Sequence, residues 1–205
     1  MPATRVTDIG DHPTMVESFR VVFVCTGNRF RSPLAAAVFE HESARDDVRA
    51  TSFGSLDLGP MPPLTKAVKT ARNLGLDITG HLARPLALAD LALADLVVGF
   101  EQAHLEAAAG EADAPPDRTF TLPELVSLLE RPPSTRIGHP IERARSRVIR
   151  AHLTRLATPS VEEPQIADPI GLRPAEQDEI ADAVERLARR LARLLFEDNG
   201  SSRAD

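Results

Sequence analysis

Hydrophobic positions along the chain fall into short continuous runs separated by longer stretches with a helical period. Residues 21–24, VVFV, form a β-branched and aromatic run that is typical of a central strand buried on both faces. Residues 48–53 and 94–100 predict two further strands, and Thr119-Phe120 predicts a short fourth strand. Because these runs alternate with helical stretches, the pattern predicts a single, doubly wound α/β domain with a parallel sheet.

The stretches between the runs combine helical spacing of apolar residues with end signals. Ser32 is placed to cap a first helix, with Pro33 in its first turn. Thr121 and Glu124 form a capping box further along, and Gly75 is a natural helix end. The predicted helices cover residues 32 to about 41, 64–74, 101–109, 121–130, 141–156 and 173–196.

The predicted helix over residues 141–156 is rich in arginine. We expect its buried side to comprise Ile141, Ala144, Val148, Ile149, His152 and Leu156. We interpret the rest of its surface as a solvated face, and the alternative is a face that docks an acidic partner. The arginines of this face are Arg143, Arg145, Arg147, Arg150 and Arg155.

Length and composition narrow the class of protein. The 205 residues suit one α/β domain, predicted over 19–197, with a flexible leader at 1–18 and a tail at 198–205. The net charge of −6 argues against a nucleic-acid binder, which usually carries a basic domain. No stretch approaches the roughly 20 apolar residues of a membrane span, so we expect no membrane partner.

Cysteine usage and motif content bear on location and cofactors. A single cysteine excludes an intramolecular disulfide and a multi-cysteine zinc site, and it fits a reducing cytoplasm. The sequence has no Walker loop, no dinucleotide glycine fingerprint and no metal-ligand spacing. We therefore expect a cytoplasmic protein that uses neither a cofactor nor a metal.

The polar segment after the first predicted strand carries the candidate chemistry. A loop that joins a strand to a helix start turns several backbone N–H groups toward one point, where the helix dipole adds positive potential. Gly27 lets the backbone bend closely and Asn28 tolerates left-handed angles. Arg31 offers a planar fork that matches two oxygens of a tetrahedral anion, and Cys25 at the mouth of the loop is a candidate thiolate nucleophile.

These residues resemble the signature loop of the low-molecular-weight protein tyrosine phosphatases. Cys25, five intervening residues, Arg31 and Ser32 follow the family spacing, and Gly27, Asn28 and Pro33 match as well. A second match lies far downstream, where residues 166–169, Ile-Ala-Asp-Pro, resemble the late Asp-Pro loop of the family. The resemblance covers roughly residues 19–105 and 164–197, and it implies a four-stranded parallel sheet with a phosphate-binding loop after strand one.

The resemblance also implies a role for each matched residue. Cys25 would be the nucleophile, Asp168 the general acid, and Ser32 would stabilise the thiolate as a leaving group. Arg31 and the backbone of the loop would bind phosphate, and the loop residues are Thr26, Gly27, Asn28, Arg29, Phe30, Arg31 and Ser32.

Two supporting residues and several departures follow from the same comparison. The resemblance implies that Ser52 and His81 support Asn28; a plain strand-end serine and a loop histidine that caps backbone groups are the alternatives. Leu58, Ile170 and Gly171 stand where the family often has aromatic pocket walls. Phe30 replaces a frequent second cysteine, and it either contacts the substrate or anchors the loop in the core.

Together these features predict a metal-free phosphomonoesterase of the protein-tyrosine-phosphatase type that works through a phosphocysteine intermediate. Its substrate would be a phosphorylated protein or a small phosphomonoester, while the oligomeric state is left open. Two alternatives remain: an arsenate reductase that hands its product to a small thiol, and a poorly catalytic phosphate-binding protein.

Overall fold

The computed structural model describes residues 18–131, 138–158 and 165–197. The predicted tail, the leader except for Ser18, and the prolines at 132 and 133 lie outside the described residues. Within the described ranges, no helix is both long and apolar enough to cross a membrane.

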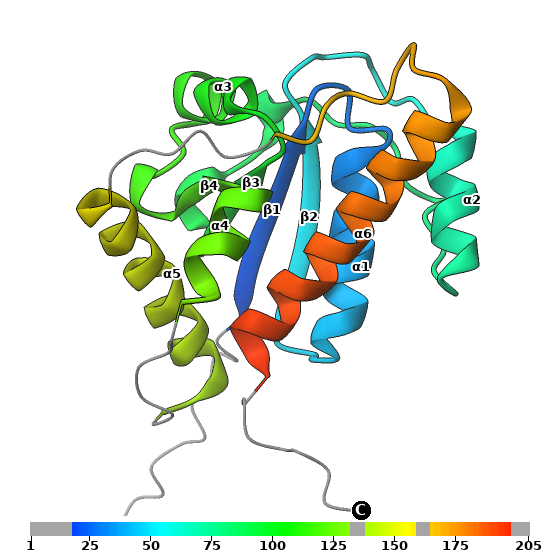
Figure 1. Ribbon diagram of the computed structural model, residues 1–205. Coiled ribbons are helices and arrows are strands. Elements are labelled where there is room, and N and C mark those ends of the chain that lie inside the picture. The colour runs from blue at the N-terminus through cyan, green and yellow to red at the C-terminus, as the bar shows by residue number, and fades with distance from the viewer. Residues whose placement is uncertain (1–17, 132–137, 159–164, 198–205) are drawn as a thin grey trace, which may run out of the picture.

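A four-stranded sheet forms the centre of the molecule (Figure 1). Its strands are β1 (Phe19–Cys25), β2 (Val48–Gly54), β3 (Leu96–Gly99) and β4 (Thr119–Thr121). They run in the order β2-β1-β3-β4, and every neighbouring pair is parallel. The predicted α/β class and the four parallel strands are therefore confirmed, including the short fourth strand.

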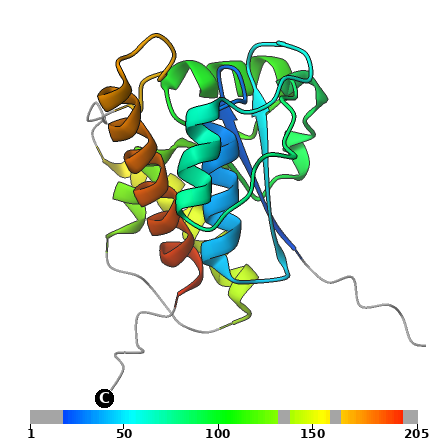
Figure 2. The same ribbon diagram turned by 90° about the vertical axis from the view of Figure 1, so that its right-hand side faces the viewer.

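Helices connect the strands and cover both faces of the sheet. The α-helices are α1 (Arg31–Ser43), α2 (Thr65–Asn73), α3 (Gln102–Ala112), α4 (Leu122–Leu129), α5 (Pro140–Ala157) and α6 (Pro174–Phe196). Three short 3-10 turns add to them: η1 (Leu86–Leu88), η2 (Leu91–Leu93) and η3 (Pro116–Arg118). Figure 2 shows α1, α2 and α6 side by side over one face of the sheet.

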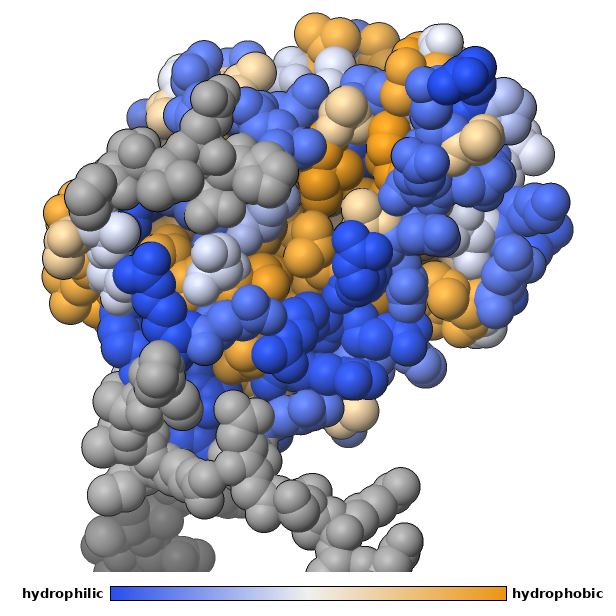
Figure 3. All heavy atoms as spheres, in the orientation of Figure 1, coloured by the Kyte–Doolittle hydropathy of each residue, from blue (hydrophilic) through white to orange (hydrophobic). Residues whose placement is uncertain are grey.

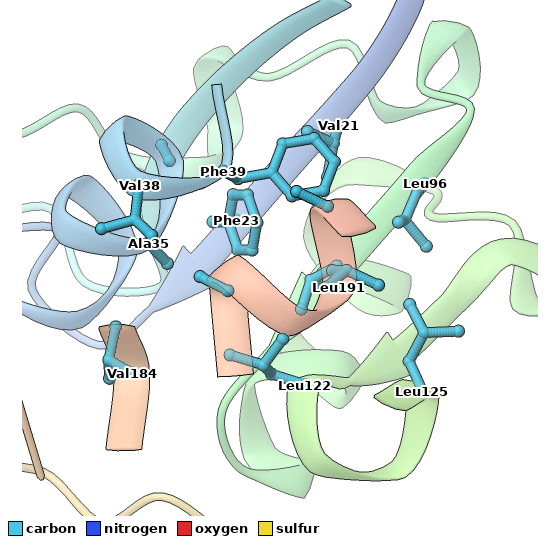
Figure 4. Packing of buried hydrophobic residues seen from close by; sticks show 14 of the residues in the cluster. Val21, Phe23, Ala35, Val38, Phe39, Leu96, Leu122, Leu125, Val184 and Leu191 are labelled. Carbon is cyan, nitrogen blue, oxygen red and sulfur yellow. The ribbon is translucent and has the colours of Figure 1, made fainter. Parts of the chain in front are cut away.

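Side chains of β1 alternate between two hydrophobic clusters. Val21 and Phe23 join α1, α4 and α6 in the larger cluster, part of which Figure 4 shows. Val22 and Val24 join a smaller cluster on the other face, together with Leu86 of η1. Because both faces of β1 are buried, the strand reads as a continuous apolar run rather than as an alternating one.

The start of α1 differs from the prediction. The helix begins at Arg31 and its N-cap is Phe30, so the prediction that Ser32 caps the helix is wrong. Ser32 already lies one residue inside the helix, where its hydroxyl turns into the preceding loop and bonds to Cys25 and Asn28. The predicted capping box of Thr121 and Glu124 at α4 is confirmed.

The buried side of α5 is also displaced from the predicted one. Ile149 and Leu156 are 55% and 69% exposed, so their placement in the core was wrong, whereas Ala151 is buried. Both residues lie about 80–100° around the helix from Val148, which is the centre of the buried stripe. That stripe is narrow, and its members are Ile141, Ala144, Val148 and Ala151.

Several arginines of α5 bind within the protein instead of forming a solvated face. Arg145 Nε donates to Asp95 Oδ1 at 2.8 Å, and Arg147 Nη1 donates to the carbonyl of Leu194 at 2.8 Å. The guanidinium of Arg155 lies 4.2 Å from the ring centroid of Phe120. The interpretation of this side as solvated was therefore wrong, because these guanidinium groups attach α5 to the rest of the fold.

Candidate active site

Cys25 ends β1, and its thiol is buried beside the start of α1. Its Sγ lies 3.0 Å from Ser32 Oγ, and the residue is only 3% exposed. Asn28 Nδ2 donates to Ser32 Oγ at 2.9 Å, so the hydroxyl hydrogen of Ser32 is left for another acceptor. A thiolate has no hydrogen to give, and it would therefore accept that hydrogen bond from Ser32.

The loop after Cys25 uses its carbonyl groups but not its N–H groups. The carbonyls of Cys25, Thr26, Asn28 and Arg29 accept from Ser55 N, Leu56 N, His81 Nε2 and Leu64 N, at 2.8–2.9 Å. Among the described residues, no protein acceptor receives a hydrogen bond from the N–H groups of Thr26 through Ser32. Unused N–H groups at a helix start are donors available to an anion.

Asn28 fixes the shape of this loop. Its φ of 51° lies in the left-handed region that asparagine tolerates. Its side-chain Nδ2 also donates to Ser52 Oγ at 2.9 Å, and its Oδ1 accepts from the backbone N–H of Arg84 at 3.0 Å. The expected contacts of Ser52 and His81 with Asn28 are both present, although His81 reaches the backbone carbonyl.

His81 has its pKa lowered, chiefly by burial, and the nearby charge of Arg84 acts in the same direction. A neutral imidazole can donate through Nε2 to the Asn28 carbonyl and leaves no extra positive charge under the loop. The backbone bond from Arg84 to Asn28 has no signal in the sequence.

Arg31 is buried, and its guanidinium joins four partners. Nη1 donates to Glu101 Oε2 at 2.7 Å and to the carbonyl of Ile166 at 2.8 Å. Nη2 donates to Thr26 Oγ1 at 3.0 Å and to Asp168 Oδ2 at 2.5 Å. The fold therefore brings Asp168 to the loop that contains Cys25, as the resemblance implied.

Sequence reasoning missed Glu101 and His104, at the turn between β3 and α3. Glu101 pairs with Arg31, and His104 Nε2 lies 3.1 Å from Thr26 Oγ1. Both residues also serve the start of α3, where they form its capping box. A glutamate and a histidine at a helix start carry no sequence signal beyond capping, so nothing in the sequence pointed to the loop 70 residues earlier.

Two of the predicted phosphate-binding residues direct their side chains elsewhere. Arg29 Nε donates to the carbonyl of Pro62 at 2.8 Å, which ties the loop to the proline-rich segment after β2. Phe30 is 4% exposed and belongs to the larger hydrophobic cluster. Of the two possibilities for Phe30, the structure has the anchor in the core.

Exposed aliphatic side chains lie in the loops around the site. Leu58, Met61 and Ile170 are 41%, 38% and 61% exposed, and Ile170 N donates to Asp168 Oδ1. Figure 3 shows hydrophobic residues at the upper end of the molecule, where the loops after β2 and before α6 lie in Figure 1. In the described part of the chain, no group of three or more His, Cys, Asp or Glu side chains could hold a metal ion.

Comparison with known proteins identifies the family of the chain. Residues 20–131, more than half of the chain, match the family described as low molecular weight phosphotyrosine protein phosphatase. The protein-arginine-phosphatase of Bacillus subtilis is 31% identical over 111 residues, which cover 52% of this chain and 72% of that protein. The low molecular weight protein-tyrosine-phosphatase of Streptomyces coelicolor is 38% identical over 97 residues, which cover 44% of this chain and 57% of that protein.

Solved structures agree with the fold. A crystal structure of a YwlE mutant from Bacillus subtilis superposes with a TM-score of 0.63 at 24% identity, covering 87% of this chain and 99% of that chain. The match of the family over residues 20–131 includes β1 to β4 and the loop of unused N–H groups. The chain belongs to the low molecular weight phosphotyrosine protein phosphatase family, whose members are cysteine-dependent phosphatases.

Proposed function

We propose that this protein hydrolyses phosphate groups through a phosphocysteine intermediate on Cys25, without a metal. One observation carries the proposal: among the described residues, the N–H groups from Thr26 to Ser32 have no protein acceptor, and their loop joins the buried thiol of Cys25 to Arg31. Donors placed where the charge of a transferring phosphoryl group develops supply most of the catalysis in such reactions. The proposed cradle is these seven N–H groups together with the Arg31 guanidinium.

In the first step the Cys25 thiolate attacks phosphorus, so that a sulfur–phosphorus bond forms while the bond to the leaving group breaks. The electron pair of the broken bond goes to the leaving atom, and Asp168 gives it a proton. In the second step water attacks the phosphocysteine, Asp168 takes a proton from that water, and sulfur leaves as a thiolate that accepts a hydrogen bond from Ser32. Inorganic phosphate and the free enzyme result.

The contact between Asp168 and Arg31 has a place in this sequence. The carboxylate lies on Nη2 of Arg31, on the donor that a bound phosphate oxygen would use. A phosphate group that takes this N–H would release Asp168, which would bind a proton from solvent and then give that proton to the leaving group. Substrate binding and the supply of the general acid would then be linked through a single nitrogen atom.

The substrate we propose is a phosphorylated protein, and we propose that the enzyme acts on it in the cytoplasm. Phosphotyrosine is one candidate, given the family. Phosphoarginine is the second candidate, supported by the 31% identity with a protein-arginine-phosphatase and by Leu58 and Ile170 at the places of aromatic walls. Without ring stacking, an aromatic substrate would lose roughly 0.5–1.5 kcal/mol of binding for each missing wall.

The first test is hydrolysis of p-nitrophenyl phosphate in the presence of a chelator, with wild type beside Cys25→Ser and Asp168→Ala. We expect turnover in the wild type, none in Cys25→Ser, and a loss on the order of 10²–10⁴-fold in Asp168→Ala. Folding of each variant is checked by thermal melting. Turnover that survives in Cys25→Ser would rule out the phosphocysteine, and phosphate binding without any turnover would favour a non-catalytic role.

Substrate choice is tested on matched peptides that carry phosphotyrosine or phosphoarginine at the same position. A ratio of kcat/KM above about tenfold in either direction identifies the preferred chemistry, since that ratio corresponds to about 1.4 kcal/mol in the transition state. Consumption of arsenate in the presence of a small thiol is measured on the same protein. Thiol-dependent consumption would favour the alternative that the protein is an arsenate reductase.

A further inference from the structure

The turn between β3 and α3 lies against the cradle and contacts it at two points. Glu101 Oε2 receives Nη1 of Arg31 at 2.7 Å, while Asp168 lies on the other terminal nitrogen, Nη2. Arg31 is 1% exposed, and a buried guanidinium needs its charge compensated. If Asp168 leaves Nη2 during the reaction, Glu101 is the carboxylate that stays on Arg31 and holds the guanidinium in place.

The second contact runs through His104, whose ring is 2% exposed. Its Nδ1 accepts from the backbone N–H groups of Phe100 at 3.3 Å and Glu101 at 3.1 Å, so this nitrogen holds no hydrogen. The hydrogen of the neutral ring is therefore on Nε2, which donates to Thr26 Oγ1 at 3.1 Å.

The charged groups that face the ring come from three elements. The pKa of His104 is lowered to about 4, mainly by burial and next by the charge of Arg31. Glu101 and Asp168 raise this pKa, but their effects are smaller. The imidazole is therefore neutral at neutral pH. A second ring hydrogen, on Nδ1, would point at two N–H groups and break the turn.

The Thr26 hydroxyl thereby receives two hydrogen bonds. His104 Nε2 is one donor, and Arg31 Nη2, at 3.0 Å, is the other. A hydroxyl oxygen has two lone pairs and one hydrogen, so both lone pairs are engaged and the hydrogen remains for a further acceptor. No described residue of the protein provides that acceptor.

We infer that Glu101 and His104 are positioning residues of the phosphate site: Glu101 holds Nη1 of Arg31, and His104 holds the Thr26 hydroxyl, which steadies Nη2 and keeps its own hydrogen for a phosphate oxygen. The inference rests on the proposed phosphatase function. It adds the turn between β3 and α3 to the two segments already assigned to the site, which are the loop after β1 and the segment of Asp168. It also assigns the Thr26 side chain, in addition to its N–H group, a contact with the substrate.

The test of Glu101 uses kcat and KM for p-nitrophenyl phosphate. We expect Glu101→Ala to lower kcat/KM on the order of 10²-fold, because a misplaced binding group has an effect of that size. Glu101→Gln keeps an acceptor oxygen, and its loss should be smaller. Glu106→Gln, on the exposed side of the same helix, is the matched control and should equal the wild type. Glu101→Ala within about twofold of the wild type in kcat/KM would overturn this half of the inference.

The test of His104 is a double-mutant cycle with Thr26. If His104 acts through Thr26, the combination of Thr26→Val with His104→Leu should be no worse than the worse single variant. Thr26→Ser and His104→Gln keep a hydroxyl and a donor, and they should recover most of the activity. Losses that multiply, or a lower melting temperature with unchanged kcat and KM, would show a merely structural role. If His104→Leu fails to fold, the cycle is run with His104→Gln.

Binding of inorganic phosphate, measured by calorimetry, separates failure of the inference from failure of the proposed function. Phosphate should bind the wild type more tightly than Glu101→Ala and Thr26→Val by at least about tenfold. A wild type that neither binds phosphate nor hydrolyses the ester would remove both claims. If the wild type binds phosphate or hydrolyses the ester, the proposed function stands. If Glu101→Ala and Thr26→Val then bind phosphate as tightly as the wild type, the inference alone is removed.

Discussion

Gly54 illustrates how a single residue connects a strand to the site. It ends β2 opposite Cys25, and a Cβ at this position would lie 2.9 Å from the Thr26 carbonyl oxygen and 3.1 Å from Asn28 N. Both of these atoms are backbone, so neither can rotate away. The close approach of β2 to the loop after Cys25 therefore requires glycine, which has no side chain, at position 54.

Substituting Gly54→Ala should accordingly displace the cradle. We expect a loss of about 1–3 kcal/mol in the free energy of unfolding, as for overpacked sites, together with a fall in kcat/KM. Gly110→Ala in α3 is the matched control, because a Cβ there meets nothing within 4 Å and alanine suits a helix interior better by up to about 1 kcal/mol. Urea unfolding and ester hydrolysis check both. Equal behaviour of the two variants would contradict the steric argument.

His104 also predicts a dependence of stability on pH. Its pKa is about 4 in the folded protein against 6.5 for an ordinary histidine. As pH falls from 6.5 toward 4, the unfolded chain binds a proton that the folded chain refuses, so stability decreases, by about 3 kcal/mol in full. The lowered pKa of His81 acts in the same direction.

The variant His104→Gln should therefore show a shallower loss of stability over this range than the wild type. Urea midpoints at several values between about pH 7 and about pH 4.5 provide the measurement. Carboxylates titrate in both proteins, so the difference between the two curves isolates the histidine. Parallel curves would mean that His104 is not held neutral by the fold.

Among the helices, α5 packs only a narrow stripe of buried side chains against the rest of the fold. Two of its buried residues are alanines, and much of its attachment comes from guanidinium groups; Arg155 Nη1 donates to the Thr119 carbonyl at 2.9 Å, for example. A helix fixed in this way buries only one narrow line of side chains.

This arrangement predicts opposite outcomes for two apolar residues of α5. Val148→Ala should cost about 2 kcal/mol of stability, because Val148 is 2% exposed and a cavity would remain. Leu156→Ala should stay within about 0.5 kcal/mol, because that side chain is 69% exposed. Thermal and urea unfolding measure both. A larger loss of stability for Leu156→Ala than for Val148→Ala would mean that Leu156 is buried, as expected from the sequence.

The same contrast explains which parts of the structure could be predicted from sequence. The strands and the loop from Cys25 to Ser32 are local patterns, so their residues are adjacent in the chain and could be identified together. Ile149 and Leu156 were wrongly placed in the core and Ala151 was not named, because a helical period allows several neighbouring stripes and only the packing against other helices selects one. Glu101 and His104 reach Arg31 and Thr26 across 70 and 78 residues, and no local pattern encodes such a contact.

Considered as a whole, the molecule is acidic, with a net charge of −6, while its candidate site is built for anions. Attraction of a phosphate must therefore act at short range, through the cradle, against the field of the protein. Long-range repulsion between like charges weakens as salt shortens the Debye length, from about 30 Å at 0.01 M to about 8 Å at 0.15 M.

Raising the salt concentration over this range should therefore increase kcat/KM for an acidic phosphopeptide and decrease it for a basic one, by a few-fold in each case. The two peptides would share the phosphorylated residue and differ only in the flanking charges. A decrease of equal size for both peptides would mean that the local charge of Arg31 dominates the approach of the substrate.

Ile166 has a consequence for how this fold tolerates change. Its N–H donates to the Phe100 carbonyl at 2.9 Å, and its own carbonyl accepts from Arg31, so the segment that carries Asp168 is attached to the centre of the molecule at its own beginning. These two bonds hold the backbone two residues before the acid, at a point downstream of α5. Residues inserted next to Gln165, upstream of this attachment, should therefore disturb Asp168 less than residues inserted between Ile166 and Asp168. New surfaces can be added at this point of the chain without redesigning the chemistry.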